Sequence, residues 1–329
     1  MHPYWRSWRT RSALLVGLAL VAAAALFAAT AASSPAKRYR IIMLSASNVI
    51  PGWHGYDRGA KEAAQKLGVD LTIAQWASLE PKDLIAGINA VVAQHPDAAL
   101  FSAVNDKAEQ NTLAQAAKRI KKIVIFDSPA VDPTPFATYV GSNAAAEGRV
   151  TADVLAKLVG GKGTVLETDA APGFSTLEIN MRAFRAEMKK YSKITLLPLQ
   201  YDGGDVAKNA AIVRATLARY PNLAGIYLGT SGLGGEGGVG AVKAAGKIGK
   251  VKLVTLDGLP AAITDLQKGY QQAVVSVKLR DLGGGAVNAA VRALNGKNLP
   301  KTTYVGYCIL TKQNVNDPKN SQCIYISKS

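Results

Sequence analysis

Short apolar runs alternate with amphipathic segments along the chain from about residue 37 onward. Each run is rich in Val, Ile and Leu and is bounded by Gly, Pro, Asn or Asp, a pattern typical of buried β-strands. The predicted strands cover residues 40–46, 70–75, 98–103, 122–127, 137–142, 163–168, 194–200, 224–229, 252–257 and 272–277.

The segments between these runs have helical periodicity, with glycine or proline at many of their ends. Helices are predicted over residues 57–68, 80–96, 176–191, 205–221 and 279–297, and a shorter one begins at Pro260. Alternation of apolar strands with helices predicts α/β architecture with parallel sheets covered on both faces. The strands outnumber those of one compact open sheet, so we expect two doubly wound domains.

The N-terminus has the pattern of a secretory signal peptide, assigned to residues 1–35. Arg6, Arg9 and Arg11 precede an unbroken apolar run from residue 13 to 29, and Ala-Thr-Ala follows with cleavage expected near Ala31. The alternative is an uncleaved membrane anchor, since the run is only slightly short for a span. No later segment is apolar enough to cross a bilayer. We therefore expect export to the periplasm.

Charge and cysteine content narrow the expected partners. The chain of 329 residues has a formal net charge of +16, but its lysines and arginines are spread along the sequence, which favours a solvated basic surface over a nucleic-acid site. The two cysteines, Cys308 and Cys323, predict a disulfide in an exported chain. Closing a loop of about 15 residues stabilises the fold by about 3 kcal/mol. The three histidines show no spacing of metal ligands.

Two aspartates end predicted strands in the same way. Asp127 and Asp257 each follow an apolar run and precede small residues and a proline. Ligands of open α/β sheets bind beyond the carboxyl ends of the strands. If the aspartates belong to different domains, their carboxylates face one cleft and can hold hydroxyls or an ammonium group. The alternative is helix capping, above all for Asp257, which lies just before the helix at Pro260.

Other polar and aromatic residues also stand at predicted strand ends or turns. Singly, each residue of this kind more often has a structural role, whereas together they favour a cleft. These candidates are Asn48, Trp53, Asn180, Arg182 and Tyr201.

The glycine-rich segment at residues 229–240 fits G-x-G-x-x-G at Gly232, Gly234 and Gly237. The fit is weak, because the segment would match many templates and lies late in the chain rather than in a first β–α unit. Leu233 interrupts a G-x-S-x-G hydrolase motif. We therefore expect no cofactor and no catalytic residues, and we interpret the glycines as sites of close backbone approach.

Several stretches together resemble the periplasmic sugar-binding proteins of ABC importers, in particular the ribose-binding group. They are residues 41–68, 123–130, 139–157, 252–276 and 286–297. The resemblance implies a type I periplasmic binding protein with two Rossmann-like domains and three hinge crossings, near Gly141–Ser142, Val277 and Tyr307. It implies an N-terminal lobe of residues 37–141 and 278–306, and a C-terminal lobe of residues 142–277 and 307–329.

The resemblance also implies a set of ligand-binding residues. Asp127 and Asp257 match the carboxylates of the two domains, and the remaining matches are Trp53, Ser102, Asn143, Tyr201 and either Thr230 or Ser231. Three positions depart from the family: Gly52 replaces an aromatic residue, Asn180 an arginine and Val277 a glutamine. The ligand class thus stays open between a sugar, a smaller polyol and a less hydroxylated solute.

The function expected from these observations is capture of a sugar or polyol by hinge closure, followed by delivery to an ABC permease. Delivery to a chemoreceptor is a further option. We expect a monomer without nucleic-acid partners. The alternative is an exported α/β enzyme acting on a small polar substrate. A transcription regulator of the same fold would need an N-terminal DNA-binding segment, where this chain has a signal peptide.

Overall fold

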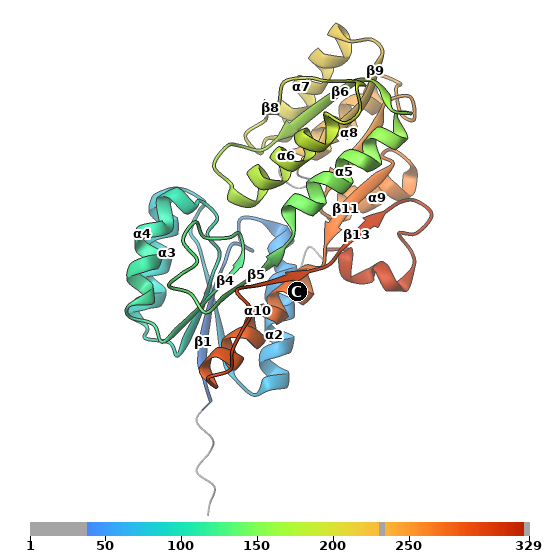
Figure 1. Cartoon of the computed structure of the whole chain (residues 1–329). Coiled ribbons are helices and arrows are strands. Elements are labelled where there is room, and N and C mark those ends of the chain that lie inside the picture. The colour runs from blue at the N-terminus through green and yellow to red at the C-terminus, as the bar shows by residue number, and fades with distance from the viewer. Residues whose placement is uncertain (1–37, 230–233, 326–329) are drawn as a thin grey trace, which may run out of the picture. The chain divides into compact units, whose positions relative to one another are not determined.

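The structure of the protein is a computed structural model that describes residues 38–229 and 234–325. The predicted signal peptide and two candidate residues, Thr230 and Ser231, lie outside these ranges. Within them, no helix combines the length and apolar character needed to span a membrane. The described chain forms two α/β units, and each unit consists of one sheet with its flanking helices (Figure 1).

The first sheet has six strands in the order β12-β5-β4-β3-β1-β2, all paired in parallel. Its strands are β1 (Arg40–Ser45), β2 (Asp70–Gln75), β3 (Ala98–Phe101), β4 (Lys122–Asp127), β5 (Thr138–Ser142) and β12 (Thr302–Val305). Its helices are α2 (His54–Leu67), α3 (Pro81–Ala93), α4 (Asp106–Ala117) and α10 (Leu279–Leu294). Helix α2 packs against α10, and α3 packs against α4 on the other side of the sheet (Figure 1).

The second sheet has the order β13-β11-β10-β9-β6-β7, with β8 paired to β6 and with β13 antiparallel to β11. Its strands are β6 (Lys162–Asp169), β7 (Lys193–Leu196), β8 (Gln200–Tyr201), β9 (Leu223–Leu228), β10 (Lys252–Leu256), β11 (Ala273–Val277) and β13 (Tyr307–Leu310). Its helices are α5 (Ala144–Leu158), α6 (Ser175–Met188), α7 (Val206–Arg219), α8 (Gly235–Ala244) and α9 (Pro260–Lys268). Helix α5 packs against α6, and α7 packs against α8.

The chain passes between the two sheets at three places. It leaves the first sheet after β5 at Ser142, returns after β11 at Val277, and leaves again between Val305 of β12 and Tyr307 of β13. These are the segments where hinge crossings were expected. The exact lobe boundaries stay a prediction.

Glycines permit the close crossing of α2 and α10. A Cβ atom added to Gly283 would lie 2.0 Å from the carbonyl oxygen of Tyr56, and one added to Gly59 would lie 2.0 Å from that of Arg280. Both distances are far below a van der Waals contact, so only glycine allows the two backbones to approach this closely. The crossing therefore fixes the position of Tyr56 on α2.

The glycine-rich segment has a related role. A Cβ atom on Gly237 would lie 1.9 Å from the carbonyl oxygen of Val206, so this glycine lets α8 pack directly on α7. The third glycine of the weak dinucleotide pattern therefore has a packing reason for its presence. Gly232 lies outside the described residues.

Candidate ligand-binding cleft

A cavity of about 130 Å³ is lined by residues that follow strands of both sheets. Most of its wall is apolar or aromatic. The polar side chains of the lining are Asp127, Ser128, Ser142, Glu147, Thr176, Asn180 and Asp257, together with the hydroxyls of Tyr56 and Tyr325. The cavity thus has a mostly apolar wall with a few polar groups, which is the usual composition of a small-molecule site.

Asp127 ends β4 and adopts a left-handed backbone conformation with φ of 62°. A non-glycine residue in this region is strained, and such strain collects at functional sites. The hydroxyl of Tyr139 donates to its carbonyl oxygen at 2.6 Å. The Tyr56 hydroxyl donates to carboxylate atom Oδ1 at 2.6 Å, and the hydroxyls of Ser102 and Ser128 both donate to Oδ2 at 3.2 Å.

Asp257 repeats this arrangement on the second sheet. It follows β10 with φ of 68°, and the hydroxyl of Tyr325 donates to its Oδ1 at 2.9 Å. The N-cap of the next helix, α9, is Leu259, whose own side chain makes no capping hydrogen bond. Asp257 is therefore not the N-cap residue of α9. Two strained aspartates, each held by a tyrosine, face one cavity from two sheets.

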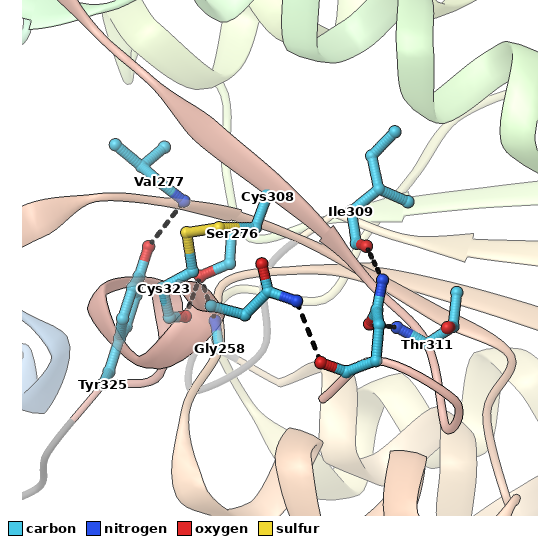
Figure 2. The surroundings of a disulfide bond; sticks show 10 residues. Gly258, Ser276, Val277, Cys308, Ile309, Thr311, Cys323 and Tyr325 are labelled. Atoms are coloured by element: carbon cyan, nitrogen blue, oxygen red, sulfur yellow. Dashed lines mark hydrogen bonds between the residues drawn. A yellow bond between two sulfur atoms is a disulfide. The ribbon is translucent and has the colours of Figure 1, made fainter. Parts of the chain in front are cut away.

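The disulfide brings Tyr325 to Asp257. Cys308 of β13 and Cys323 at the end of a 3-10 helix are joined, with their Cα atoms 6.1 Å apart. Figure 2 shows the hydrogen bonds beside this bridge: the Ser276 hydroxyl donates to the carbonyl oxygen of Cys323 at 2.6 Å, and the Val277 amide donates to the Tyr325 hydroxyl at 3.2 Å. The C-terminal segment is thereby fixed against β11, and its tyrosine closes one wall of the cavity.

Aromatic rings form the wall near the first sheet. Trp53 is only 6% exposed and makes edge contacts with Tyr56, Trp76 and Phe126, with ring centroids 5.2 to 5.7 Å apart. Such contacts hold the indole in one orientation. Trp53 is therefore both a packing anchor and part of the cavity wall.

Two further polar side chains enter the cavity from the helices of the second sheet. Glu147 in the first turn of α5 is 4% exposed, and its Oε1 has no hydrogen-bond partner among the described residues. Asn180 in α6 is 1% exposed and accepts a hydrogen bond from the Tyr227 hydroxyl at 2.8 Å, whereas its Nδ2 has no such partner. A Cβ atom on Gly148 would lie 2.2 Å from the Asn180 carbonyl oxygen, so this glycine lets α5 and α6 approach each other.

Burial dominates the electrostatics of the cavity. It raises the pKa of Glu147 to about 7 and that of Asp257 to about 6, and the negative charges of Asp127 and, for Glu147, Asp257 add to these shifts. Burial also raises the pKa of Asp127, opposed by its hydrogen bonds from Tyr56, Ser102 and Ser128. The carboxylates thus disfavour each other's ionised forms.

Of the predicted residues, Trp53, Asp127, Asn180 and Asp257 line the cavity together. Ser102 is fully buried and does not line the cavity; it contacts two residues that do, donating to Asp127 Oδ2 at 3.2 Å and accepting from the Ser128 amide at 3.3 Å.

Four others do not line the cavity. Asn48 donates to the Trp76 carbonyl oxygen at 2.8 Å, and Asn143 caps α5 by accepting from the Ala146 amide at 3.0 Å. Arg182 lies on the exposed face of α6, and Tyr201 is 39% exposed on the short strand β8. The sequence pattern placed Asn48, Arg182 and Tyr201 near strand ends or turns, and the family resemblance implied Asn143. Neither source showed which way these side chains point.

Sequence reasoning missed Tyr56, Glu147 and Tyr325. Tyr56 lies inside helix α2 and Tyr325 lies in the C-terminal tail. Both are away from the strand ends, where the sequence analysis placed its candidates. Glu147 carried a usable signal, because it is a lone carboxylate among small residues in NAAAEG. In this structure Glu147 is 4% exposed, and the neighbouring Gly148 lets α5 and α6 pack closely.

Two sheets that are parallel except for β13, each with flanking helices, form the architecture of type I periplasmic binding proteins. The family model of the periplasmic binding protein domain matches residues 41–298, and the chain belongs to this family. The ribose import binding protein RbsB of Salmonella typhimurium is 23% identical over 294 residues, which cover 89% of this chain and 97% of that protein.

Solved structures have the same fold. An ABC transporter solute-binding protein from Agrobacterium vitis, bound with α-D-tagatopyranose, has a TM-score of 0.82 and 26% identity, covering 88% of this chain and 100% of that one. GanP, a glucose-galactose binding protein from Geobacillus stearothermophilus, has a TM-score of 0.79 and 21% identity, covering 85% of this chain and 99% of that one. The predicted fold class and family are confirmed.

Proposed function

We propose that this protein is a periplasmic solute-binding protein, which captures a compact polar solute of the sugar class and delivers it to an ABC importer. The observation that carries the proposal is the pair of strained aspartates, Asp127 and Asp257, which face one cavity from different sheets. Ionised carboxylates accept hydrogen bonds from hydroxyl groups, so two of them on opposite walls can orient a polyhydroxylated ring.

The relatives support the solute class and the transport role. Their names describe ribose import and binding of tagatose, glucose or galactose, always as binding proteins rather than enzymes. The family's description, periplasmic binding protein domain, and the N-terminal signal-peptide pattern support a periplasmic location. We propose Trp53, Asp127, Asn180 and Asp257 as ligand contacts, extended by Tyr56, Glu147 and Tyr325.

The mechanism we propose is closure of two lobes about the three chain crossings, with the boundaries expected from the sequence. A bound solute contacts groups on both sheets at once, and it does so fully only when the lobes close. Closure is therefore favoured by the contacts that the solute gains in the closed form. The permease then recognises the closed form.

The test combines identification of the solute with a binding measurement. The small molecule that copurifies with the protein is identified by mass spectrometry, and the ligand-free protein is then screened by thermal shift against monosaccharides and polyols. A bound solute raises the melting temperature according to its concentration relative to Kd. Asp127→Asn should remove the shift, whereas Asp281→Asn, on the exposed surface of α10, should keep it. A response to NAD with none to sugars would contradict the proposal.

A further inference from the structure

We propose that the solute is a glycoside whose sugar lies in the cavity at Asp127 and Asp257, while an apolar group on the sugar, such as a phenyl ring, lies in a second cavity beside it. This inference rests on the proposed function and specifies the solute class of the same cleft. It comes from the position, the lining and the hydrogen bonds of the second cavity. We call the first one the cleft cavity and the second one the side cavity.

The side cavity has a volume of about 220 Å³ and is lined by residues of both α/β units. The first unit contributes β5, β12 and the segment after β4, and the second unit contributes the N-terminal parts of α5 and α6, where α5 follows β5 directly (Figure 1). Ser142 and Thr176 line both cavities. The two cavities therefore lie on either side of these two short side chains, and one solute can extend from one cavity into the other.

The wall of the side cavity is largely apolar. The aromatic rings of Phe136, Tyr139 and Tyr304 line it, and those of Tyr139 and Tyr304 make an edge contact with their centroids 6.4 Å apart. Among the described residues, its lining contains no Asp, Glu, Lys, Arg or His. A charged group would lose its hydration here without gaining an opposite charge, whereas an apolar ring packs well against aromatic edges and faces.

Polar side chains of this wall are already engaged in hydrogen bonds within the protein. These bonds run from the Thr138 hydroxyl to the Pro300 carbonyl oxygen at 2.7 Å, from the Ala146 amide to the Asn143 side chain at 3.0 Å, from the Thr176 hydroxyl to the Ser128 hydroxyl at 2.9 Å, and from Ser142 to Glu147. A second sugar ring would need free hydrogen-bonding groups to replace the water that its hydroxyls lose. The side cavity therefore suits an apolar ring better than a second sugar.

The size of the side cavity also suits one aromatic ring. Its volume of about 220 Å³ exceeds that of an engineered apolar cavity of about 150 Å³ that holds one benzene molecule. The cleft cavity keeps the carboxylates of Asp127 and Asp257 for the hydroxyls of the sugar. The polar and the apolar part of a glycoside thus each have a matching space.

The border between the two cavities includes a contact between the two units. Thr176 of α6 donates to the hydroxyl of Ser128, which follows β4 in the first unit. In the proposed mechanism, opening of the lobes separates these two residues. A solute with two parts can then enter both cavities before the lobes close.

Matched glycosides test the inference. Calorimetric titration of the ligand-free protein compares the phenyl β-glycoside with the methyl β-glycoside of D-glucose, of D-galactose and of D-xylose. For at least one sugar, the phenyl glycoside should bind at least tenfold more tightly than the methyl glycoside, which corresponds to about 1.4 kcal/mol. The two glycosides share the sugar and the linkage, so the preference reports the apolar group. The three free sugars and phenol are titrated as well.

The possible outcomes separate this inference from the proposed function. A preference below tenfold for every sugar overturns the inference, and binding of a free sugar or a methyl glycoside then leaves the sugar-binding function standing. Phenol that binds beside a free sugar, without a gain for the phenyl glycoside, shows a separate apolar site and also overturns the inference. Absence of binding by all the probes overturns it too, and the copurified molecule then decides the function.

A variant that fills the side cavity provides the second test. Ala145 lines the side cavity and does not line the cleft cavity. Ala145→Leu should therefore reduce the preference for the phenyl glycoside about tenfold and keep the affinity for the methyl glycoside. Tyr304→Ala, which removes a ring that is 57% exposed, serves the same purpose if Ala145→Leu does not fold. Ala215→Leu, at an exposed position of α7, is the matched control and should leave the preference unchanged. An unchanged preference in the folded cavity variant would contradict the placement of the apolar group.

Discussion

In the proposed site, Asp127 and Asp257 lower the stability of the ligand-free protein at the positions where we expect the solute to bind. Each holds a left-handed backbone with a buried carboxylate. Both features are unfavourable before a solute binds, because the backbone is strained and the charge lacks water.

Asp257→Asn should therefore stabilise the ligand-free protein while it abolishes solute binding. The variant removes a buried charge whose pKa is raised to about 6, and we expect a gain of about 1 kcal/mol or more in the free energy of unfolding at pH 7.5. Urea denaturation and calorimetric titration of the same samples measure the two effects. A variant that loses both stability and binding would show that the carboxylate supports the fold instead.

Stability of the ligand-free protein should rise as the pH falls from 8 to 5. Glu147 and Asp257 have pKa values of about 7 and about 6 in the folded protein, above those of an unfolded chain, so the folded state binds more protons in this window. The free energy of unfolding then falls with rising pH. Glu167 and Asp169, with pKa raised to about 7 by burial, act in the same direction.

Urea midpoints at several pH values check this expectation. Glu147→Gln should make the profile flatter, because one of the contributing groups no longer titrates. A midpoint that decreases between pH 8 and pH 5 would contradict the assigned pKa directions.

At the scale of elements, the α2–α10 crossing connects helix packing to the cleft. Gly283→Ala would force Cβ into the carbonyl oxygen of Tyr56 and separate the helices. We expect a loss of about 2 kcal/mol or more in the free energy of unfolding, and weaker solute binding as Tyr56 moves from Asp127. Gly240→Ala, in α8 with open space around the new methyl group, is the matched control.

The disulfide should support both stability and binding. Cys308→Ser with Cys323→Ser is expected to lower the free energy of unfolding by about 3 kcal/mol, because the cross-link closes a loop of about 15 residues. It should also weaken solute binding, since the tail that holds Tyr325 on Asp257 is released. Tyr325→Phe with the bridge intact should weaken binding with a smaller loss of stability. Equal solute affinity of the unmodified protein, the double cysteine variant and Tyr325→Phe would show that the disulfide does not support the cleft.

The sequence predicted elements well where periodicity was strong. All ten predicted strands and the long helices are present, and Gly68 ends α2 as expected. The short strands β8, β12 and β13 were not predicted, because two to four residues carry too little pattern and their pairing comes from distant strands. Helices α4 and α5 were also not among the predicted elements; α5 is rich in alanine, which weakens the contrast between its faces.

At the scale of the whole molecule, the site was predicted only in part. Asp127 and Asp257 were found because the carboxyl ends of parallel strands are a general place for ligands. Tyr325 and Glu147 reach the cavity through the disulfide-linked tail and the close α5–α6 contact, which depend on tertiary packing. For Tyr325 the local sequence carries no signal of this contact, whereas for Glu147 the only local signal is its position among small residues.

Solute binding should also change the dimensions of the molecule. If the chain crossings at Ser142, Val277 and Gly306 form a hinge, a saturating solute should decrease the radius of gyration measured by X-ray scattering. Asp127→Asn, which should not bind the solute, should keep the larger radius under the same conditions. An unchanged radius in the presence of a bound solute would contradict hinge closure.

The disulfide Cys308–Cys323, which holds Tyr325 beside Asp257, should determine when the protein can bind its proposed solute tightly. Newly translated copies in a thiol-rich cytosol would keep both sulfurs reduced, with the tail not yet fastened. If the protein is exported as proposed, these copies would bind the solute more weakly until the disulfide forms in the periplasm. Preparations made in reducing buffer should correspondingly understate the affinity of the mature protein.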